Sequence, residues 1–433
     1  MALGSLQASL FDDTNEGINF SGKLGADAAI WYPASGCRSY RYGSLSDVGS
    51  YAFCWSASPN SNYAYYMYFI YDGRIYSSKH NVRAYGLSVR CVKEGTTPSE
   101  PVAVNLSESG TANSYIVSSS GSYKFSTVKG NSSESVGAVA SAEVLWESFG
   151  TDVTPNVGDL VKNVSYNNGE ITFDTADTFK EGNAVIAAKD ASGNILWSWH
   201  IWLTDQPQGQ EYYNNAGTMM DRNLGATSAT PGDVGALGLL YQWGRKDPFL
   251  GSSSISSDIE AKSTGTWPSA VSSNSANGTI KYATAYPTTF IKYNSSNYDW
   301  YYTGSSTTDN TRWTTSTATK SIYDPCPAGW RVPDGGSNGV WSKAGFDDKT
   351  YDSTNEGMSF SISSPSTTWY PASGFRLSSD GSIGNVGSTG YYWSASPINY
   401  DAYFLYFDYN GTVGPSVSTN TRAAGYSVRC LQE

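Results

Sequence analysis

Short runs in which apolar and polar residues alternate recur through the middle of the chain and predict β-strands. Between residues 102 and 205 these runs are separated by Gly, Asn and Asp, which favour turns. The clearest pair lies at 184–202, where Trp197 and Trp199 share one strand face and His200 lies on the other. The pattern predicts an immunoglobulin-like β-sandwich over 102–205, with both tryptophans in its core and His200 pointing at solvent or at a backbone partner.

The segments beside this region have different patterns. Residues 95–101 (GTTPSEP) are rich in turn formers and poor in apolar residues, so they predict a linker. Residues 211–433 show weak periodicity and many Ser, Asn, Thr and Gly. Their most polar stretch, 251–312, predicts long loops, which are either functional or disordered.

A segment near the start of the chain is repeated at its end. Residues 55–94 and 393–433 share the frame WSASP…AY..YF.Y.G…RA.G.SVRC, and the similarity continues upstream. The first copy therefore covers 5–94, and the second begins near residue 342. The residues that precede the second copy have no counterpart before the first, so we expect 5–94 to be the C-terminal half of a domain. The chain is then expected to be a fragment of a longer polypeptide; a half-domain that packs in a non-standard way is the alternative.

Inside the shared frame, the residues that differ between the copies follow a pattern. In the predicted strand 402–410, positions 403, 405, 407 and 409 keep similar side chains, whereas positions 404, 408 and 410 change. A period of two predicts that one strand face is buried and that the other faces solvent. The adjoining turn changes as well, and so do the residues on both sides of Gly425.

We predict that these changing residues contact a ligand. In the second copy they are Ile398, Asn399, Tyr400, Asp401, Phe404, Asp408, Asn410, Thr412, Ala424 and Tyr426. Their counterparts in the first copy are Asn60, Ser61, Asn62, Tyr63, Tyr66, Ile70, Asp72, Tyr85 and Leu87. Rigid Tyr side chains supply contact area in antibody combining sites, and small polar residues adapt the hydrogen bonding. A fixed frame with exchangeable residues favours a binding surface over an active site.

Composition and charge limit the class of partner. Aromatic residues make up 14% of the chain, charged residues make up 15%, and the net charge is −11 without any basic cluster. Nucleic acid is therefore not expected as a partner. No apolar run reaches the roughly 18 residues of a membrane-spanning helix. The first residues lack the basic and apolar regions of a signal peptide, so export would require a signal upstream of Met1.

The five cysteines predict up to two disulfides. Cys430 has a candidate partner in Cys326, within the same predicted domain, and Cys37 and Cys54 form a second candidate pair. Two bridges would suit an extracellular or cell-surface location. Five reduced, buried thiols are the alternative.

Few residues offer catalytic or metal-binding chemistry. His80 and His200 fall in different predicted modules, which argues against a catalytic triad or a zinc centre. The repeated TNEG motif is interpreted as a tight turn and not as a glycosidase carboxylate pair. We therefore expect a protein without enzymatic activity, metal or cofactor.

Three phrases are distinctive: MDRNLGA (220–226), LYQWGRKDPF (240–249) and DPCPAGWRVPD (324–334). Together with WSAS and SVRC, and in this order, they resemble the Fibrobacter succinogenes major paralogous domain family, over essentially all of 211–433. This family belongs to the C-type lectin-like group and occurs on surface and fimbrial tip proteins of gut Bacteroidetes. The resemblance implies a C-type lectin-like domain with two small helices, a twisted sheet and long loops. The EPN, QPD and WND triplets of calcium-dependent lectins are absent, which puts calcium-mediated sugar binding in doubt.

The changing positions also resemble the variable regions of proteins diversified by retroelements, which C-type lectin-like domains display; drift between duplicated domains is the alternative. The expected fold is mainly β with minor α. The expected function is a non-enzymatic surface or secreted protein that binds a protein or glycan of a host, bacterium or phage, with Trp393, Arg422, Arg429 and the cysteine pair holding its loops. The alternatives are a fimbrial tip adhesin or pilus subunit that assembles by strand addition, and a polysaccharide-acting enzyme.

Overall fold

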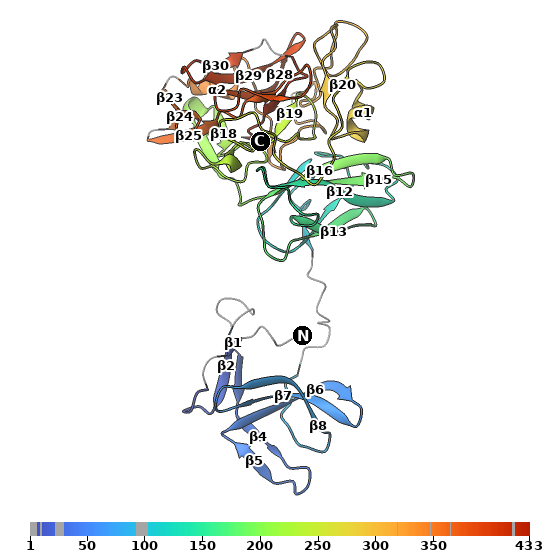
Figure 1. Cartoon of the computed structure of the whole chain (residues 1–433), viewed down its shortest axis with the longest axis vertical. Coiled ribbons are helices and arrows are strands. Elements are labelled where there is room, and N and C mark those ends of the chain that lie inside the picture. Colours follow the sequence, from blue (N-terminus) through green and yellow to red (C-terminus); the bar gives the residue numbers. More distant parts are fainter. Residues whose placement is uncertain are drawn as a thin grey trace. The chain divides into compact units, whose positions relative to one another are not determined.

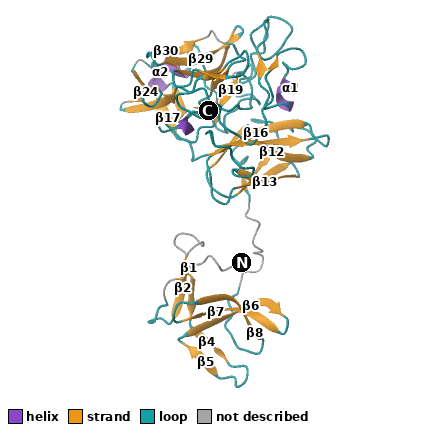
Figure 2. Ribbon diagram, viewed as in Figure 1, coloured by secondary structure: helices purple, strands orange, loops and turns teal. Residues whose placement is uncertain are grey.

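The computed structural model divides the chain into two compact units, Met1–Ser99 (unit 1) and Glu100–Glu433 (unit 2) (Figure 1). It describes residues 7–8, 11–21, 30–91, 103–317, 319–346, 348–363, 365–417 and 421–433. The protein is mainly β, with 42% strand and 4% helix (Figure 2), as predicted. In the described part of the chain, no helix has the length and apolar character needed to cross a membrane.

Unit 1 consists of two small sheets. The first has the order β1–β2–β3, with bounds Gln7–Ala8, Gly17–Ser21 and Ile30–Pro33. The second has the order β5–β4–β6–β7–β8, with bounds Leu45–Val48, Ser35–Arg38, Tyr51–Asn60, Tyr63–Ile70 and Ile75–Val82. Its core is small, with Ile18, Ala34, Ala52 and Phe69 as the buried members.

Unit 2 begins with two four-stranded sheets that pack face to face. One has the order β10–β16–β15–β12, with bounds Ser114–Val117, Ile195–Leu203, Gly182–Lys189 and Ser141–Ser148. The other has the order β13–β14–β11–β9, with bounds Val161–Asn167, Glu170–Thr175, Ser122–Ser126 and Val104–Asn105. The β15–β16 hairpin forms as predicted. Trp197 and Trp199 lie in the core between the sheets, which confirms that prediction too.

The second face of β16 is also buried, which corrects the prediction for His200. Its imidazole lies between the Ser114 hydroxyl (3.0 Å) and the Asn183 side-chain oxygen (2.8 Å). On the same face, the Ser198 hydroxyl donates to the Asp247 carboxylate at 2.6 Å. The prediction was wrong because this sheet packs against residues of the C-terminal part of unit 2, so both faces of β16 are buried from Trp197 to Leu203. Trp202 of β16 belongs to the same core cluster as Trp243.

The C-terminal part of unit 2 is built around a larger mixed sheet. Its order is β27–β26–β31–β28–β29–β30, with bounds Ile383–Gly384, Phe375–Arg376, Gly425–Ser427, Thr389–Ile398, Asp401–Asp408 and Val413–Val417, and β19 (Leu240–Gln242) pairs with β31. A second sheet has the order β17–β18–β32–β22, with bounds Gly209–Tyr212, Gly217–Met220, Leu431–Gln432 and Trp330–Arg331. A third has the order β23–β24–β25, with bounds Lys349–Asp352, Gly357–Ser363 and Ser366–Pro371.

Short elements complete this part. They are β20 (Val271–Ser272), β21 (Ile291–Lys292), α1 (Ile280–Ala285), α2 (Val340–Ala344) and the 3₁₀ turns Tyr213–Asn215 and Val234–Ala236. The remaining backbone is largely loop, with the long polar stretch between β19 and β22 as its main part (Figure 2).

The predicted disulfide Cys326–Cys430 forms, whereas the pair of Cys37 and Cys54 does not. Strands β4 and β6 pair with Gly36 opposite Ala52. Beyond this pair Arg38 bridges to Gly86 and Cys54 bridges to Ser88, so the segment 86–88 separates the two strands where the cysteines lie. Cys37 is buried, Cys54 is partly buried and Cys91 is exposed, and all three are free thiols.

Candidate ligand-binding face

The predicted contact residues of the second copy have different environments. Phe404, Ala424 and Tyr426 are only 2%, 1% and 0% exposed. Asn399, Asn410 and Thr412 are exposed, as is Tyr400 with 43% of its surface; Ile398, Asp401 and Asp408 are intermediate. The prediction that this whole set faces solvent was therefore wrong for Phe404, Ala424 and Tyr426.

These three residues are buried because both faces of the β28–β29 ribbon are covered. Tyr426 stacks on Trp393 at a ring distance of 4.2 Å and contacts Phe404 at 5.3 Å, within one core cluster. Leu405 and Phe407 belong to a second cluster on the other side. Positions that change between the copies can thus be core positions, where a substitution alters packing and not ligand contact.

The remaining predicted residues lie in two turns at opposite ends of β29. The turn that contains Asn399 and Tyr400 precedes the strand, and the turn that contains Asn410 and Thr412 follows it. Asp401 and Asp408 are seven residues apart, which corresponds to about 23 Å along a strand. The predicted contact residues therefore do not form one continuous surface.

The turn after β29 is stabilised by its own side chains. The Asp408 carboxylate accepts the backbone N–H groups of Asn410 and Thr412, both at 3.0 Å, and the Tyr406 hydroxyl at 3.2 Å. Burial, together with the nearby Asp408 charge, raises the pKa of Tyr406 to about 12. Asp408 thus serves the geometry of this turn, as a polar side chain commonly does in a tight turn.

The buried side chain of Arg422 stabilises the turn before β29. Ile398 pairs with Asp401, and Asn399 adopts a positive φ of 47°, a conformation that Asn tolerates better than most residues. The buried Arg422 guanidinium donates to the carbonyl oxygens of Asp401 (2.8 Å) and Asn399 (3.3 Å). The expectation that Arg422 holds the loops is met at this turn.

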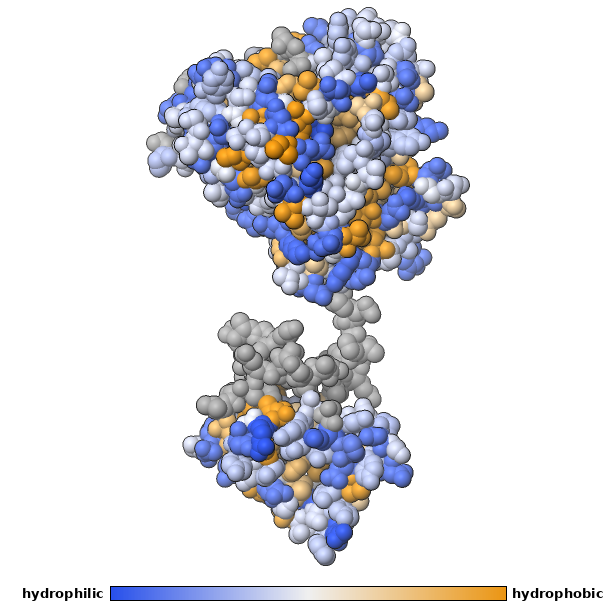
Figure 3. All heavy atoms as spheres, in the orientation of Figure 1, coloured by the Kyte–Doolittle hydropathy of each residue, from blue (hydrophilic) through white to orange (hydrophobic). Residues whose placement is uncertain are grey.

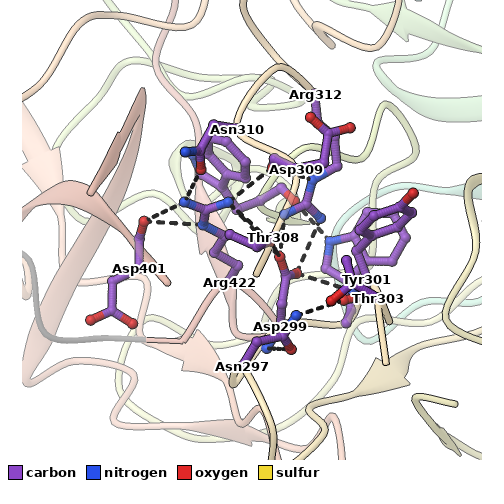
Figure 4. Close-up of polar contacts among 12 residues, drawn as sticks. Asn297, Asp299, Tyr301, Thr303, Thr308, Asp309, Asn310, Arg312, Asp401 and Arg422 are labelled. Atoms are coloured by element: carbon purple, nitrogen blue, oxygen red, sulfur yellow. Dashed lines mark hydrogen bonds and ion pairs between the residues drawn. The ribbon is translucent and has the colours of Figure 1, made fainter. Parts of the chain in front are cut away.

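Arg422 also binds the loop that faces the turn (Figure 4). It donates to the Asn310 side-chain oxygen at 2.7 Å and to the Asp309 carbonyl at 3.0 Å. The Asp401 carboxylate points away from this guanidinium in Figure 4. Burial raises the pKa of Asp401, and the Arg422 charge opposes that rise.

A buried ion pair fixes the base of the same loop. Asp299 pairs with Arg312, both side chains being fully buried, and it also accepts the Thr308 hydroxyl. Arg312 lies between the rings of Trp243 (4.9 Å) and Trp300 (4.8 Å). Sequence reasoning placed this stretch among loops that are either functional or disordered; the only available signal was the group of charged and aromatic residues within it.

Burial has a clear electrostatic effect on Arg422. Desolvation first, and then the neighbouring Arg312 charge, lowers the pKa of Arg422 to about 10. The guanidinium is therefore still protonated at neutral pH. Its ring contact with Trp243 (4.3 Å) and its carbonyl partners stabilise the charge in the absence of water.

The result is an exposed surface with a rigid base, which we name the tip face. It comprises residues 399–401 of the turn and 303–311 of the loop. The loop contributes Thr, Ser, Asn and Asp side chains that are mostly exposed, and the turn contributes the large Tyr400. This mixture of an aromatic side chain with small polar groups suits recognition of a polar partner.

In unit 1 the corresponding turn has the same construction. Asn60 pairs with Tyr63, Ser61 has a positive φ, and Asn62 is exposed. Arg83 donates to the carbonyl oxygens of Tyr63 (3.0 Å) and Ser61 (2.6 Å), as Arg422 does in unit 2.

Of the other predicted residues of the first copy, Asp72 is exposed and the rest are at least partly buried. Tyr66, Tyr85 and Leu87 are partly buried, and Asp72 caps the turn after β7 by accepting the Arg74 backbone N–H at 3.1 Å. Ile70 is 5% exposed, so its predicted exposure was wrong. This apolar side chain lies opposite Tyr51 in the β6–β7 pair and is withdrawn from water.

A separate groove lies in unit 2 between β16 and α1. It has a volume of about 770 Å³ and is lined by Trp197, Tyr282, Tyr286 and Tyr323 among other residues. Sequence reasoning did not find it, because the residues that line it come from distant parts of the chain. Among the described residues, no group of three or more His, Cys, Asp or Glu side chains is arranged to hold a metal ion.

No protein-family model, curated protein or solved structure matches this chain.

Proposed function

We propose that this chain is a non-enzymatic binding protein outside the cell and that its tip face recognises a protein or glycan ligand. The observation that supports this is the exposed turn and loop held on a buried framework of Arg422, Arg312 and Asp299. A binding surface gains affinity when its loops are ordered before the ligand arrives, since less conformational entropy is lost. The exposed Tyr400 supplies an aromatic anchor, and the Ser, Thr and Asn side chains supply adaptable hydrogen bonds.

The fold proposals follow from the sequence resemblance. We propose an immunoglobulin-like sandwich for 102–205 and a C-type lectin-like domain for 211–433. The paired four-stranded sheets, the two short helices and the long loops support this proposal. The buried Cys326–Cys430 disulfide supports an oxidising location, such as the cell surface.

Burial divides the changing residues into two groups that bear differently on the proposed diversification by a retroelement. Turn positions 398–401 fit that proposal, because side chains there are exposed or only partly buried and can vary with little loss of packing. Phe404, Ala424 and Tyr426 fit drift between two cores better, because each is in contact with neighbouring core residues. The same reasoning removes them from the proposed ligand contacts.

The test screens the whole chain for binding to purified host and bacterial glycans, soluble host proteins and intact bacterial cells. For any ligand found, the variant Tyr400→Ser is compared with Tyr409→Ser, an exposed tyrosine at the opposite turn, and with Tyr286→Ser in the groove. We expect Tyr400→Ser to weaken binding about tenfold or more, as loss of an aromatic anchor does. The two other variants should bind normally, and all three should keep the wild-type melting temperature.

Two outcomes would contradict the proposal. If Tyr286→Ser lost binding while Tyr400→Ser bound normally, the ligand would be bound in the groove and not at the tip face. If the protein chemically converted a bound glycan, it would be an enzyme, and the proposal of a non-enzymatic binding protein would be wrong.

A further inference from the structure

Unit 1 and the end of unit 2 share more than sequence, since equivalent side chains make equivalent contacts. Arg38 donates to the Gly43 carbonyl at 2.8 Å, and Arg376 donates to the Gly381 carbonyl at 2.7 Å. Arg90 lies over the Tyr32 ring (4.4 Å), as Arg429 lies over the Tyr370 ring (3.7 Å). Together with the Arg83 and Arg422 contacts, this shows that both copies form the same half of a fold.

In unit 2 that half is covered by residues 209–346. Strand β19 pairs with β31, so that Tyr241 lies opposite Tyr426. The Trp243 indole donates to the Ser394 carbonyl at 2.8 Å, and the Trp393 indole donates to the Tyr241 carbonyl at 2.9 Å. The Cys326–Cys430 disulfide adds a covalent link between the two halves.

Among the described residues of unit 1, the corresponding surface is exposed. Val89 is 67% exposed, whereas its counterpart Val428 is 0% exposed. Ser56 and Ala57 are exposed, although their counterparts in unit 2 are buried. Trp55 and Leu87 are partly exposed, and Figure 3 shows apolar groups at the surface of unit 1. We name these five residues (Trp55, Ser56, Ala57, Leu87 and Val89) the open face.

The backbone at the open face is also available for pairing. The backbone of Gly86 is hydrogen-bonded to that of Arg38, and the backbone of Ser88 to that of Phe53. In unit 2 their counterparts Gly425 and Ser427 likewise pair with the neighbouring strands β26 and β28. Within the described part of unit 1, the backbone of Leu87 makes no hydrogen bond to another backbone group. In unit 2 the equivalent residue is Tyr426, which pairs with Tyr241 of β19. An uncovered strand edge beside exposed apolar side chains is suited to the addition of a polypeptide strand.

We propose that the open face binds a polypeptide segment with the chemistry of residues 209–346. The segment would contribute a strand with the pattern of Leu240–Gln242 to the backbone around Leu87. An indole like that of Trp243 would donate to the Ser56 carbonyl, and an apolar side chain would cover Val89. Unit 1 is then an assembly site, separate from ligand recognition by the tip face.

The test supplies such a segment at high effective concentration. A second copy of residues 207–346, with Cys326→Ser in the added copy, is joined by a flexible linker ahead of the whole chain. A short linker gives millimolar effective concentrations, so failure to associate is informative. We expect amide hydrogen exchange at Leu87 and Val89 to slow by roughly 100-fold relative to the unextended chain. Alkylation of the exposed Cys91 thiol should slow by about tenfold.

Two matched variants make the result specific. Val89→Asp changes an exposed side chain of unit 1, so unit 1 should keep its fold while both forms of protection are lost. Trp243→Ala in the added copy alone should reduce the protection as well. Equal exchange and alkylation with and without the added copy would overturn the proposal. Protection that persists in Val89→Asp would overturn it too, because the segment would then lie elsewhere.

Discussion

The two copies of the repeated segment use the same frame residues in opposite environments. Trp393, Arg422 and Val428 are completely buried in unit 2, whereas Trp55 is only partly buried and Val89 is exposed in unit 1. The local hydrogen bonds are nevertheless the same, as the arginines beneath the two turns show. The shared frame residues therefore determine the local backbone geometry. How much they contribute to the free energy of unfolding depends on whether another segment of polypeptide buries them.

The largest expected contrast concerns these two arginines. Arg422→Met removes a buried charge with five polar partners, and we expect the free energy of unfolding of unit 2 to fall by about 3–5 kcal/mol. Arg83→Met removes the matching but exposed side chain, and unit 1 should lose less than about 1 kcal/mol. Denaturant unfolding followed by residue-specific hydrogen exchange separates the two units. Equal losses of unfolding free energy in the two variants would show that the burial of Arg422 does not make it more stabilising than Arg83.

The next contrast isolates apolar burial without charge. Val428→Ala should destabilise unit 2 by about 2 kcal/mol, because two buried methyl groups are lost and a small cavity is left. Val89→Ala changes a residue that is already exposed to water, and its effect should stay within about 0.5 kcal/mol. Thermal unfolding of both variants measures the difference. A comparable effect of Val89→Ala would indicate that the open face is already covered in the chain.

A smaller effect in unit 2 is expected from pH. Burial lowers the pKa of His200 to about 3, below the ordinary value of 6.5. The unfolded state therefore binds the proton more readily, and the stability associated with neutral His200 is lost as pH falls below 6.5. At pH 5.5 the loss is about 1.4 kcal/mol. Burial raises the pKa of Asp324 to about 6, and this group acts in the opposite direction, so the two proteins must be compared. The stability change between pH 7.5 and 5.5 should be less favourable in wild type than in His200→Asn by about 1.4 kcal/mol, and an identical pH dependence in both proteins would assign it to other groups.

The mainly β character of the chain and one of its hairpins were predictable because they depend on local sequence. The β15–β16 hairpin follows from two strand-forming, largely apolar runs on either side of a turn, and the Cys326–Cys430 pair follows from two cysteines in one predicted domain. The candidate site was predicted less well. The turn with Asn399 and Tyr400 is exposed as expected, but Phe404 and Tyr426 are buried, and the loop at 303–311 was not among the predicted contacts.

Alternation along a strand is a property of neighbouring residues, so the chain itself specifies which side chains share a face. Whether a face meets water or a second layer depends on segments that are distant in sequence. Tyr241 and Trp243 pack in the same cluster as Phe404, whereas Phe407 on the other face packs against Phe360. The Asp299–Arg312 pair together with Arg422 fixes a loop whose sequence shows no periodic pattern. Unit 1 provides the internal comparison. The same local pattern leaves Val89 in water there, because burial is a contact between segments and not a property of either one.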